Sequence, residues 1–354
     1  MRRQFVAICV IAGMSVGFSA VAENWADRTD RLSSAPQFAQ SKQVCRDLKS
    51  VVPPRTDAPD AVAAKSLAGC RSETLYYGIG VPRDPKRAVR CAFLEMKNSD
   101  NGGPGSFSPG FAGAAMLMTI YANGVGADRD LGVATALACQ LDGAPAEMDF
   151  RVLHLWKLKQ SGVVERHFSW CDDITSGSAD GACAAHASRI ADTVRDGKLR
   201  MLATRWIGAE RRVFTRLEDA TDAFIQARSE NEVDQSGTSR GAYVIQEQDR
   251  LKDEFIDDLS LFVSGIPPSY DAKRFLEADA ELNATYRDIL RARTWGSAFG
   301  TVTQSGIQTT QRFWLRYRDA WVAFAKQAYP QVSPDNVKAW LTIRRITELQ
   351  EFPP

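Results

Sequence analysis

The side chains best suited to chemistry lie in two short segments near the C-terminal end of the sequence. Asp279, Asn283 and Tyr286 recur at i, i+4 and i+7, which would align an acid, an amide and a phenol on one face of a helix. A second helical face would hold Gln311, Trp314, Arg318 and Trp321. If the two helices pack antiparallel with these faces together, Asp279 meets Arg318 in a partly buried, charge-assisted contact that Trp314 shields from water.

This set of residues allows two interpretations. It could line a pocket for a small ligand, formed mainly by Asp279, Tyr286 and Arg318. More often, such a set is a satisfied polar contact that fixes the register of two packed helices. We expect the second, with an ion pair between Asp279 and Arg318 inside the helix interface.

The sequence contains no recognisable catalytic or cofactor-binding constellation. Three histidines occur, His154, His167 and His186, and none lies in a strand–turn–helix context suited to a nucleophile and its base. There is no P-loop and no G-x-G-x-x-G after a strand. Acidic residues on helices are commonly surface charges rather than a glycosidase pair. We therefore expect a protein without a cofactor and without enzymatic activity.

Two cysteines flanked by two histidines form a distinctive segment in the middle of the sequence. His167, Cys171, Cys183 and His186 could be zinc ligands. The alternative is a disulfide between Cys171 and Cys183 that closes a short loop rich in serine and glycine. We expect the disulfide and no metal, because neither histidine belongs to a tight metal-ligand motif and the N-terminus indicates export to an oxidising compartment.

The N-terminus has the features of a secretory signal peptide. Arg2 and Arg3 precede an apolar stretch at 5–18, and Ala20-Val-Ala22 provides a small-residue cleavage site. The apolar stretch is shorter than the about 20 residues that a membrane anchor needs. We expect residues 1–22 to be removed by cleavage after Ala22, and the mature protein to be periplasmic or secreted without a membrane anchor.

Export makes the remaining cysteines candidates for three disulfides. Without Cys9 of the leader, the set consists of Cys45, Cys70, Cys91, Cys139, Cys171 and Cys183. Cys70 and Cys91 are equally distant from a predicted turn and could face each other across a helical hairpin. Alternatively, Cys91 and Cys139 lie on corresponding helices of neighbouring hairpins, which would leave Cys45 for Cys70. We favour the second pairing scheme.

A unit of helix, turn and helix recurs after 46 residues. Its turns share glycines that can reverse the chain at positive φ and an aspartate placed to cap the next helix. The corresponding residues are Gly78, Gly80 and Asp84 in the first turn and Gly124, Gly126 and Asp130 in the second. A fixed period of this kind is typical of helical solenoids. The segments 75–84 and 121–130 resemble Sel1-type repeats, and this resemblance implies a protein-interaction scaffold.

The C-terminal motifs, Asp-x-x-Leu-Asn-x-x-Tyr followed by Gln-x-x-Trp-x-x-x-Arg-Asp, resemble the helical domain of LprI-type lysozyme inhibitors over roughly residues 268–352. The residues that carry the resemblance are Asp279, Leu282, Asn283, Tyr286, Gln311, Trp314, Arg318 and Asp319. Members of that family usually carry a cysteine shortly after the Arg-Asp pair, bridged to a cysteine ahead of the first motif. Here Trp321 stands at that position and no cysteine follows Cys183, so we expect an apolar contact in place of the bridge.

The sequence therefore predicts an all-α, disulfide-braced protein in which a short Sel1-like solenoid of helical hairpins precedes an LprI-like helical bundle. The expected segments are a signal peptide (1–22), an extended N-terminal arm (23–58), Sel1-like repeats (59–160), a disulfide loop (161–186), long amphipathic helices (187–265) and the LprI-like domain (266–354). The polar stretch at 229–240 is expected to be a solvated turn between helices.

The predicted function is non-catalytic binding of a protein partner in the cell envelope. The resemblance to LprI implies a lysozyme as partner, whose cleft would be blocked by surface complementarity rather than by covalent chemistry. The alternatives are a Sel1-type scaffold for envelope proteins and, from a different class, a cell-wall hydrolase or ligand binder. The nearly balanced charge, 44 basic against 43 acidic residues, excludes binding of nucleic acid or membrane surfaces through a basic bias.

Overall fold

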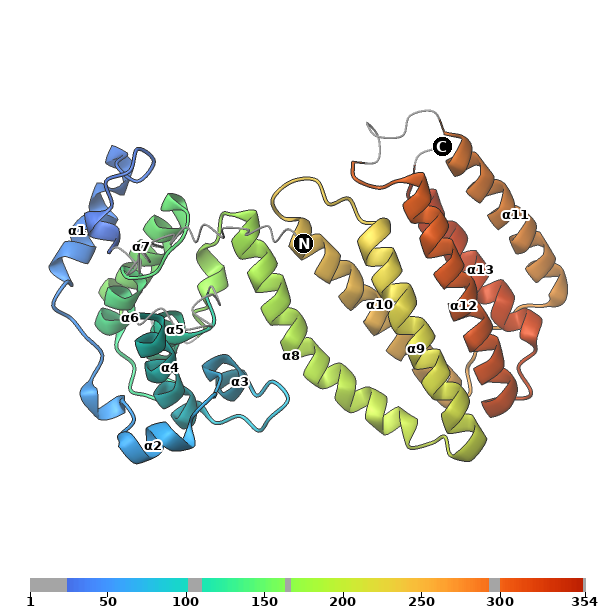
Figure 1. Cartoon of the computed structure of the whole chain (residues 1–354), viewed down its shortest axis with the longest axis horizontal. Helices are drawn as coiled ribbons and strands as arrows, with labels where there is room; N and C mark the ends of the chain where they lie inside the picture. The colour runs from blue at the N-terminus through green and yellow to red at the C-terminus, as the bar shows by residue number, and fades with distance from the viewer. Residues whose placement is uncertain (1–23, 101–109, 163–166, 293–299, 353–354) are drawn as a thin grey trace, which may run out of the picture.

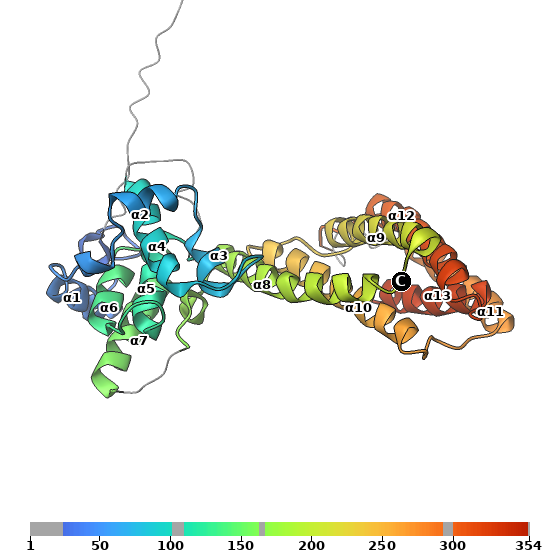
Figure 2. The same cartoon turned by 90° about the horizontal axis from the view of Figure 1, so that it is seen from below.

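The computed structural model describes residues 24–100, 110–162, 167–292 and 300–352. Across these residues every regular element is helical, which confirms the predicted all-α class (Figure 1). An N-terminal lobe and a C-terminal helical bundle follow one another along the long axis of the molecule and are joined by α8 (Gly177–Ala203) (Figures 1 and 2). None of the described helices is long and apolar enough to cross a membrane.

The N-terminal lobe is built from short helices that pack in chain order. They are α1 (Ala39–Asp47), α2 (Ala61–Ser66), α3 (Ser72–Tyr77), α4 (Pro85–Asp100), α5 (Gly113–Asn123), α6 (Leu131–Ala138) and α7 (Pro145–Ser161). From α3 to α7, each helix packs on the next. The small residues Ala88 and Ala92 on α4, and Ala134 and Ala138 on α6, are fully buried, which allows the helices to approach closely.

The turns that follow α3 and α5 have the same geometry. The predicted turn residues Gly78, Gly80, Asp84, Gly124, Gly126 and Asp130 all lie in these two turns. Gly78 and Gly124 end the helices in the left-handed conformation, at φ 78° and 64°. Asp84 and Asp130 accept hydrogen bonds of 2.9–3.0 Å from backbone N–H groups of the following helices. The repeat is thus a structural one, and its assignment to the Sel1 type stays a prediction.

Three disulfides brace the described part of the chain, and their pairing corrects one prediction. They join Cys45 to Cys139, Cys70 to Cys91, and Cys171 to Cys183. The last bridge agrees with the prediction, and the Cys70–Cys91 bridge closes the first hairpin. The favoured scheme, which paired Cys91 with Cys139 and Cys45 with Cys70, is wrong.

The segment around α1 explains the bridge between Cys45 and Cys139. An extended arm is predicted here, but the segment forms α1 and short 3-10 helices and buries Trp25 and Phe38 in the N-terminal core. Its backbone returns to the end of α6, where the Trp25 N–H donates to the Cys139 carbonyl at 2.8 Å. This return places Cys45 beside Cys139.

The helix α8 belongs to both parts of the molecule. Its first turns contain Cys183 and pack against the N-terminal core, so the predicted disulfide loop is helical from Gly177 onward. The rest of α8 packs along α10 (Arg240–Val263). Where α8 leaves the N-terminal lobe, His186 stacks on Phe111 with ring centres 3.8 Å apart.

A buried acid, Glu73, ties α3 to α8. Its side chain is 1% exposed, and its Oε1 lies 2.7 Å from Nδ1 of His186 and 2.5 Å from Nη2 of Arg189. Burial raises the pKa of a carboxyl group, but the hydrogen bonds and charges of His186 and Arg189 outweigh burial and hold the pKa of Glu73 below its ordinary value. Glu73 therefore stabilises the fold as a carboxylate.

Replacing Glu73 by glutamine should remove part of the acid sensitivity of the protein. Because the pKa of Glu73 is lower in the folded than in the unfolded chain, its stabilising contribution is present above the ordinary pKa of 4.5 and is lost as pH falls through the folded-state value. The stability difference between the wild type and Glu73→Gln, measured by urea unfolding at pH 6 and pH 3, should shrink with acidification. The exposed acid Glu281 provides the control, since Glu281→Gln should change nothing. A difference that is the same at both pH values would contradict the role of Glu73.

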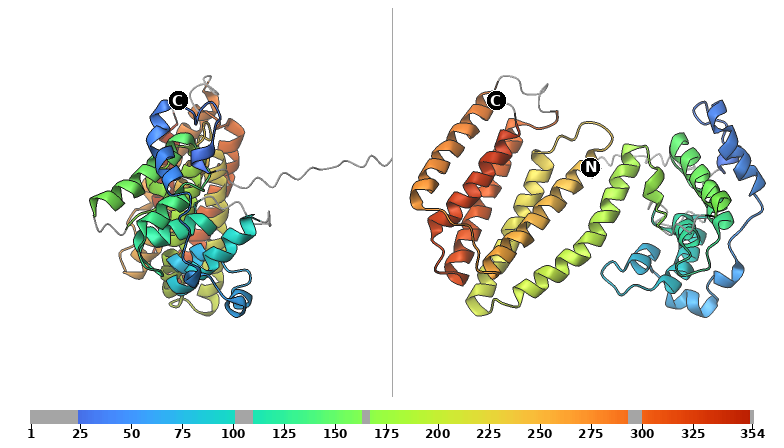
Figure 3. Two further views of the ribbon diagram at one scale, coloured as in Figure 1. Left: turned by 90° about the vertical axis from the view of Figure 1, so that its left-hand side faces the viewer. Right: turned by 180° about the vertical axis from the view of Figure 1, so that it is seen from behind.

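The C-terminal bundle is built from longer helices. Besides α8 and α10 it contains α9 (Gly208–Asn231), α11 (Ala272–Arg291), α12 (Gln304–Ala328) and α13 (Pro334–Gln350). Spatial neighbours follow the order α8, α10, α9, α12, α13 and α11 (Figure 3). The sequence-based arrangement, in which α11 and α12 pack directly against each other along their faces, is wrong, because α13 packs against both of them and sets their spacing.

Trp321 lies at the centre of the bundle's core. Its side chain is fully buried, with the ring centres of Phe262 on α10 and Trp340 on α13 at 5.3 and 5.4 Å. Phe255 and Phe324 complete the shell of rings around it. The apolar contact expected at position 321 is thus present, and it joins three helices.

Candidate functional site

A groove opens between α11 and α12. It has a volume of about 290 Å³ and is lined from α11 by Asp279, Leu282, Asn283 and Tyr286, and from α12 by Gln308, Gln311, Arg312, Trp314, Leu315 and Arg318. We call this surface the motif groove, because it gathers every predicted motif residue except Asp319. Asp319 follows Arg318 on α12 and has a side chain that is 67% exposed.

The predicted ion pair between Asp279 and Arg318 is not made. Instead, Asp279 Oδ2 accepts a hydrogen bond from Asn283 at 3.1 Å, within α11. Arg318 donates to its neighbour Asp319 at 3.3 and 3.4 Å, and its guanidinium lies 5.2 Å from the centre of the Trp314 ring. The expectation of a satisfied contact inside a helix interface is therefore wrong, since α13 holds the two helices far enough apart to leave the groove open.

Three lining residues were missed by the sequence analysis. Gln308 lies three residues before Gln311 and Leu315 lies four residues after it, so both continue the helical face of Gln311. Arg312 follows Gln311 directly and is off the i, i+3 and i+4 spacing. The helical spacing around Gln311 and Arg318 could have found Gln308 and Leu315, but it gave no signal for Arg312. Leu315 is 39% exposed and provides an apolar rim beside the polar lining.

The side-chain amide of Gln311 is held in place by a hydrogen bond from Arg345. The Nε of Arg345 donates to Oε1 of Gln311 at 2.9 Å. A guanidinium only donates hydrogen bonds, so the amide oxygen of Gln311 must face Arg345 and the NH₂ group is left for the groove. The floor of the groove thus presents an oriented donor.

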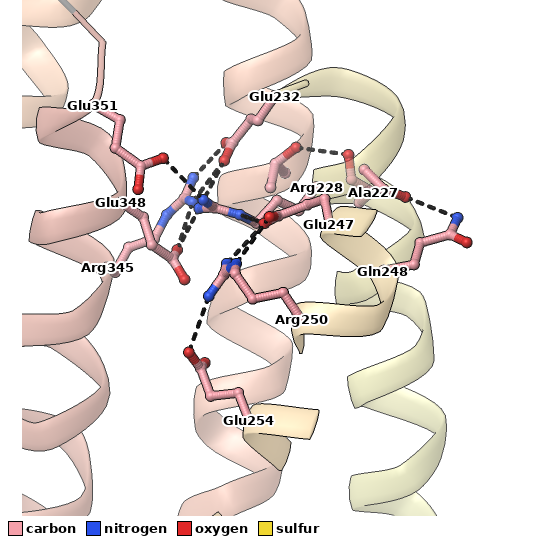
Figure 4. A network of polar contacts seen from close by, with 12 residues as sticks. Ala227, Arg228, Glu232, Glu247, Gln248, Arg250, Glu254, Arg345, Glu348 and Glu351 are labelled. Carbon is pink, nitrogen blue, oxygen red and sulfur yellow. Dashed lines mark hydrogen bonds and ion pairs between the residues drawn. The ribbon is translucent and has the colours of Figure 1, made fainter. Parts of the chain in front are cut away.

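Arg345 belongs to a buried network of charges (Figure 4). Its guanidinium is fully buried and contacts Glu232 at 2.6 and 2.8 Å and Glu348 at 3.0 Å. Arg228 on α9 joins the same network through Glu348 at 2.8 Å and Glu247 at 2.5 Å. Burial lowers the pKa of Arg345, but the two glutamates outweigh burial and raise this pKa above its ordinary value.

The position of Glu232 corrects a further expectation. The predicted turn is present between α9 and α10 and is largely exposed, but Glu232 caps the C-terminal end of α9 and its side chain is fully buried against Arg345. Its shortest contacts are with Arg345, which lies 113 residues further along the chain, whereas Arg228, four residues earlier, lies at 3.4 Å. Local sequence therefore gave no signal for this contact.

The motif groove combines charges of both signs with hydrogen-bond donors. Two guanidinium groups, from Arg312 and Arg318, face one carboxylate, Asp279. Burial raises the pKa of Tyr286, so its hydroxyl keeps its proton and can donate a hydrogen bond. The lining offers hydrogen bonds and charges but no nucleophile held by a base.

Three of the four residues of the alternative zinc site have other partners, and the fourth, His167, is exposed. His186 bonds to Glu73, and Cys171 and Cys183 are joined to each other. His154, which was not in that set, contacts Asp173 at 3.0 Å. Within the described ranges, no group of three or more histidine, cysteine or acidic side chains is arranged to hold a metal ion.

The fold and the site define a disulfide-braced, all-α protein whose polar motifs line an open groove of its C-terminal bundle. Residues 271–349, which comprise α11, α12 and nearly all of α13, match the family model described as Lysozyme inhibitor LprI. The resemblance predicted from the two motifs is thus confirmed over the matched residues, and α8, α9, α10 and the N-terminal lobe lie outside them. No curated protein and no solved structure matches the chain.

Proposed function

We propose that this chain is an exported, non-catalytic protein that binds and inhibits a lysozyme, with the motif groove as part of the contact surface. The observation that carries the proposal is the location of the motif residues. Asp279, Tyr286 and Arg318 line an open groove. Polar motif residues with a purely structural role would instead be expected to be buried between the helices. Together with the family match at 271–349, this location supports recognition of a protein partner.

The architecture supports inhibition by surface complementarity. The groove walls are faces of two long helices, and its floor amide is fixed by Arg345. Side chains that are already ordered lose little conformational entropy when a partner binds. A partner held across α11 and α12 would be blocked sterically, because a whole helical bundle would cover the bound surface.

The disulfides support an extracytoplasmic location. All six cysteines in the described part of the chain are paired, and such bridges persist in oxidising compartments such as the periplasm. This agrees with the signal peptide predicted at 1–22, which lies outside the described residues. We therefore place the proposed activity in the periplasm or outside the cell.

A clearing assay tests the proposed function. The purified mature chain (23–354) should slow the clearing of a peptidoglycan suspension by an added lysozyme in a concentration-dependent manner. Incubated alone with peptidoglycan, the chain should release no muropeptides. Full clearing at high micromolar concentrations of the chain would contradict the proposal, and muropeptide release by the chain alone would show it to be a hydrolase instead.

A further inference from the structure

We infer that the motif groove recognises a single carboxylate, the side chain of an aspartate or glutamate on the surface of its protein partner, and that Arg318 is the residue that binds it. This inference rests on the proposed function in one respect only, the assumption that the groove is the surface that contacts a partner. The chemistry of the occupant is argued from the groove itself.

Several hydrogen-bond donors that line the motif groove have no partner in the described part of the chain. Among the described residues, Arg312 has no hydrogen-bond or ion-pair partner, and neither does the hydroxyl of Tyr286. The NH₂ group of Gln311 is likewise free, because its amide oxygen is held by Arg345. Two cations and one anion line the groove, so it carries one net positive charge. An acceptor-rich group with one negative charge is the ligand that complements this lining.

The side chain of Arg318 is preorganised to bind a carboxylate. Its side chain is 16% exposed and its guanidinium rests on the Trp314 ring, which limits its rotamers. Its contacts with Asp319, at 3.3 and 3.4 Å, are longer than a charge-assisted hydrogen bond of about 2.7–2.9 Å. Because Asp319 is largely exposed, this surface ion pair is weak, and a carboxylate from a partner can replace it at little cost.

The opposite wall restricts what can enter. Asp279 is held in place by Asn283, and it would repel a second acid in the same groove. The lining therefore selects an isolated acidic side chain over an acidic cluster. A hydroxyl or backbone N–H beside that acid could donate to the free oxygen of Asp279.

The same geometry argues against a glycan as the occupant. Sugar rings commonly pack on an exposed aromatic face, but Trp314 is only 2% exposed and its ring is covered by Arg318. Tyr286 is half-buried and offers no broad platform. A carboxylate, in contrast, needs only the edge of the guanidinium, which this stacking leaves available.

A titration with short peptides tests the inference without a lysozyme. Isotope-labelled chain 23–354 is titrated with acetyl-Gly-Glu-Gly-amide and with its glutamine analogue, and the Arg318 Nε–H and Trp314 indole resonances are followed by NMR. The glutamate peptide should shift both resonances in a saturable way, and the glutamine peptide should not. Equal shifts with the two peptides would overturn the inference, and so would a larger shift with chitotriose.

A matched pair of variants keeps this test specific. Arg318→Gln should abolish the response of the Trp314 resonance to the glutamate peptide. Arg316→Gln should retain it, because Arg316 lies on the same helix and also stacks on a ring, that of Phe313 at 5.2 Å, but does not line the motif groove. Loss of the response in both variants, or in neither, would contradict the role of Arg318.

Failure of this inference can be told apart from failure of the proposed function. If lysozyme is inhibited, Arg318→Gln should weaken inhibition by roughly 10- to 100-fold, and a lysozyme with amidated surface carboxyls should be inhibited equally weakly by both forms. Inhibition that is unaffected by Arg318→Gln would leave the proposed function standing and remove the carboxylate. A glutamate-specific shift without any inhibition of lysozyme would support carboxylate recognition by the groove and remove the proposed function.

Discussion

Replacing Arg345 by methionine should lower the free energy of unfolding by about 3–5 kcal/mol. Methionine preserves much of the side-chain volume, so the effect would come from charge rather than from a cavity. Glu232, which is fully buried, loses its two shortest contacts, and Glu348 loses one of two arginine partners. Arg228 would remain at 3.4 Å from Glu232, but a buried carboxylate that loses its closest partner is strongly destabilising.

Urea unfolding at neutral pH measures this effect, and two further variants define its origin. Arg318→Ala removes a guanidinium that contacts only an exposed neighbour and an aromatic ring, so it should cost about 1 kcal/mol or less. Combining Arg345→Met with Glu232→Gln should recover part of the loss, because the buried negative charge is then gone. An Arg345→Met protein that unfolds like the wild type would refute the importance of the network.

Removing the bridge between Cys45 and Cys139 should destabilise the protein more than removing the bridge between Cys171 and Cys183. The first pair is separated by 94 residues and the second by 12. In the chain-entropy description, a loop of about 100 residues is worth about 4.7 kcal/mol and one of about 15 residues about 3 kcal/mol. The expected difference between the two double-alanine variants is therefore about 1.5–2 kcal/mol.

Unfolding of the two double-alanine variants under non-reducing conditions checks this order. Both remove two cysteines, so the change in composition is the same. Cys45 and Cys139 are buried in the N-terminal core, so their replacement also loses packing and acts in the same direction. A larger loss from the short bridge would show that native-state strain or residual structure, rather than loop length, controls the contribution of each bridge.

The sequence predicted the two repeated helical hairpins because their signals are local. Asp84 and Asp130 are caps, and Gly78 and Gly124 are helix ends, whose types and spacing are visible without any tertiary contact. The Cys171–Cys183 bridge is equally local. All of these features are determined within a dozen or so residues, and all were found.

The features that sequence reasoning missed are set by distant segments. Cys45 pairs with Cys139 because the N-terminal segment folds back onto the end of α6. Glu232 is buried by a residue 113 positions away. Neither relationship has a periodicity or a spacing that a single sequence could reveal.

The candidate site shows both behaviours at once. The motif residues of the groove were identified correctly as parts of two helical faces, because i, i+4 and i+7 spacing is local. Their contact was assigned wrongly, because Asp279 and Arg318 were expected to meet and α13 was not considered. The spacing of α11 and α12 depends on α13, which packs against both helices. The sequence of α13 contains no motif from which this role could be predicted.

The segment that matches the inhibitor family is not a removable module. Arg345 lies within residues 271–349, but Glu232, which neutralises it, lies on α9 outside them. The most extensive neighbour of α12 is also α9. Excising the matched segment would remove Glu232 from Arg345, leave Glu348 as its acidic partner, and expose the apolar side of α12 to water. Any transplant of the groove onto another scaffold therefore has to carry α9 with it.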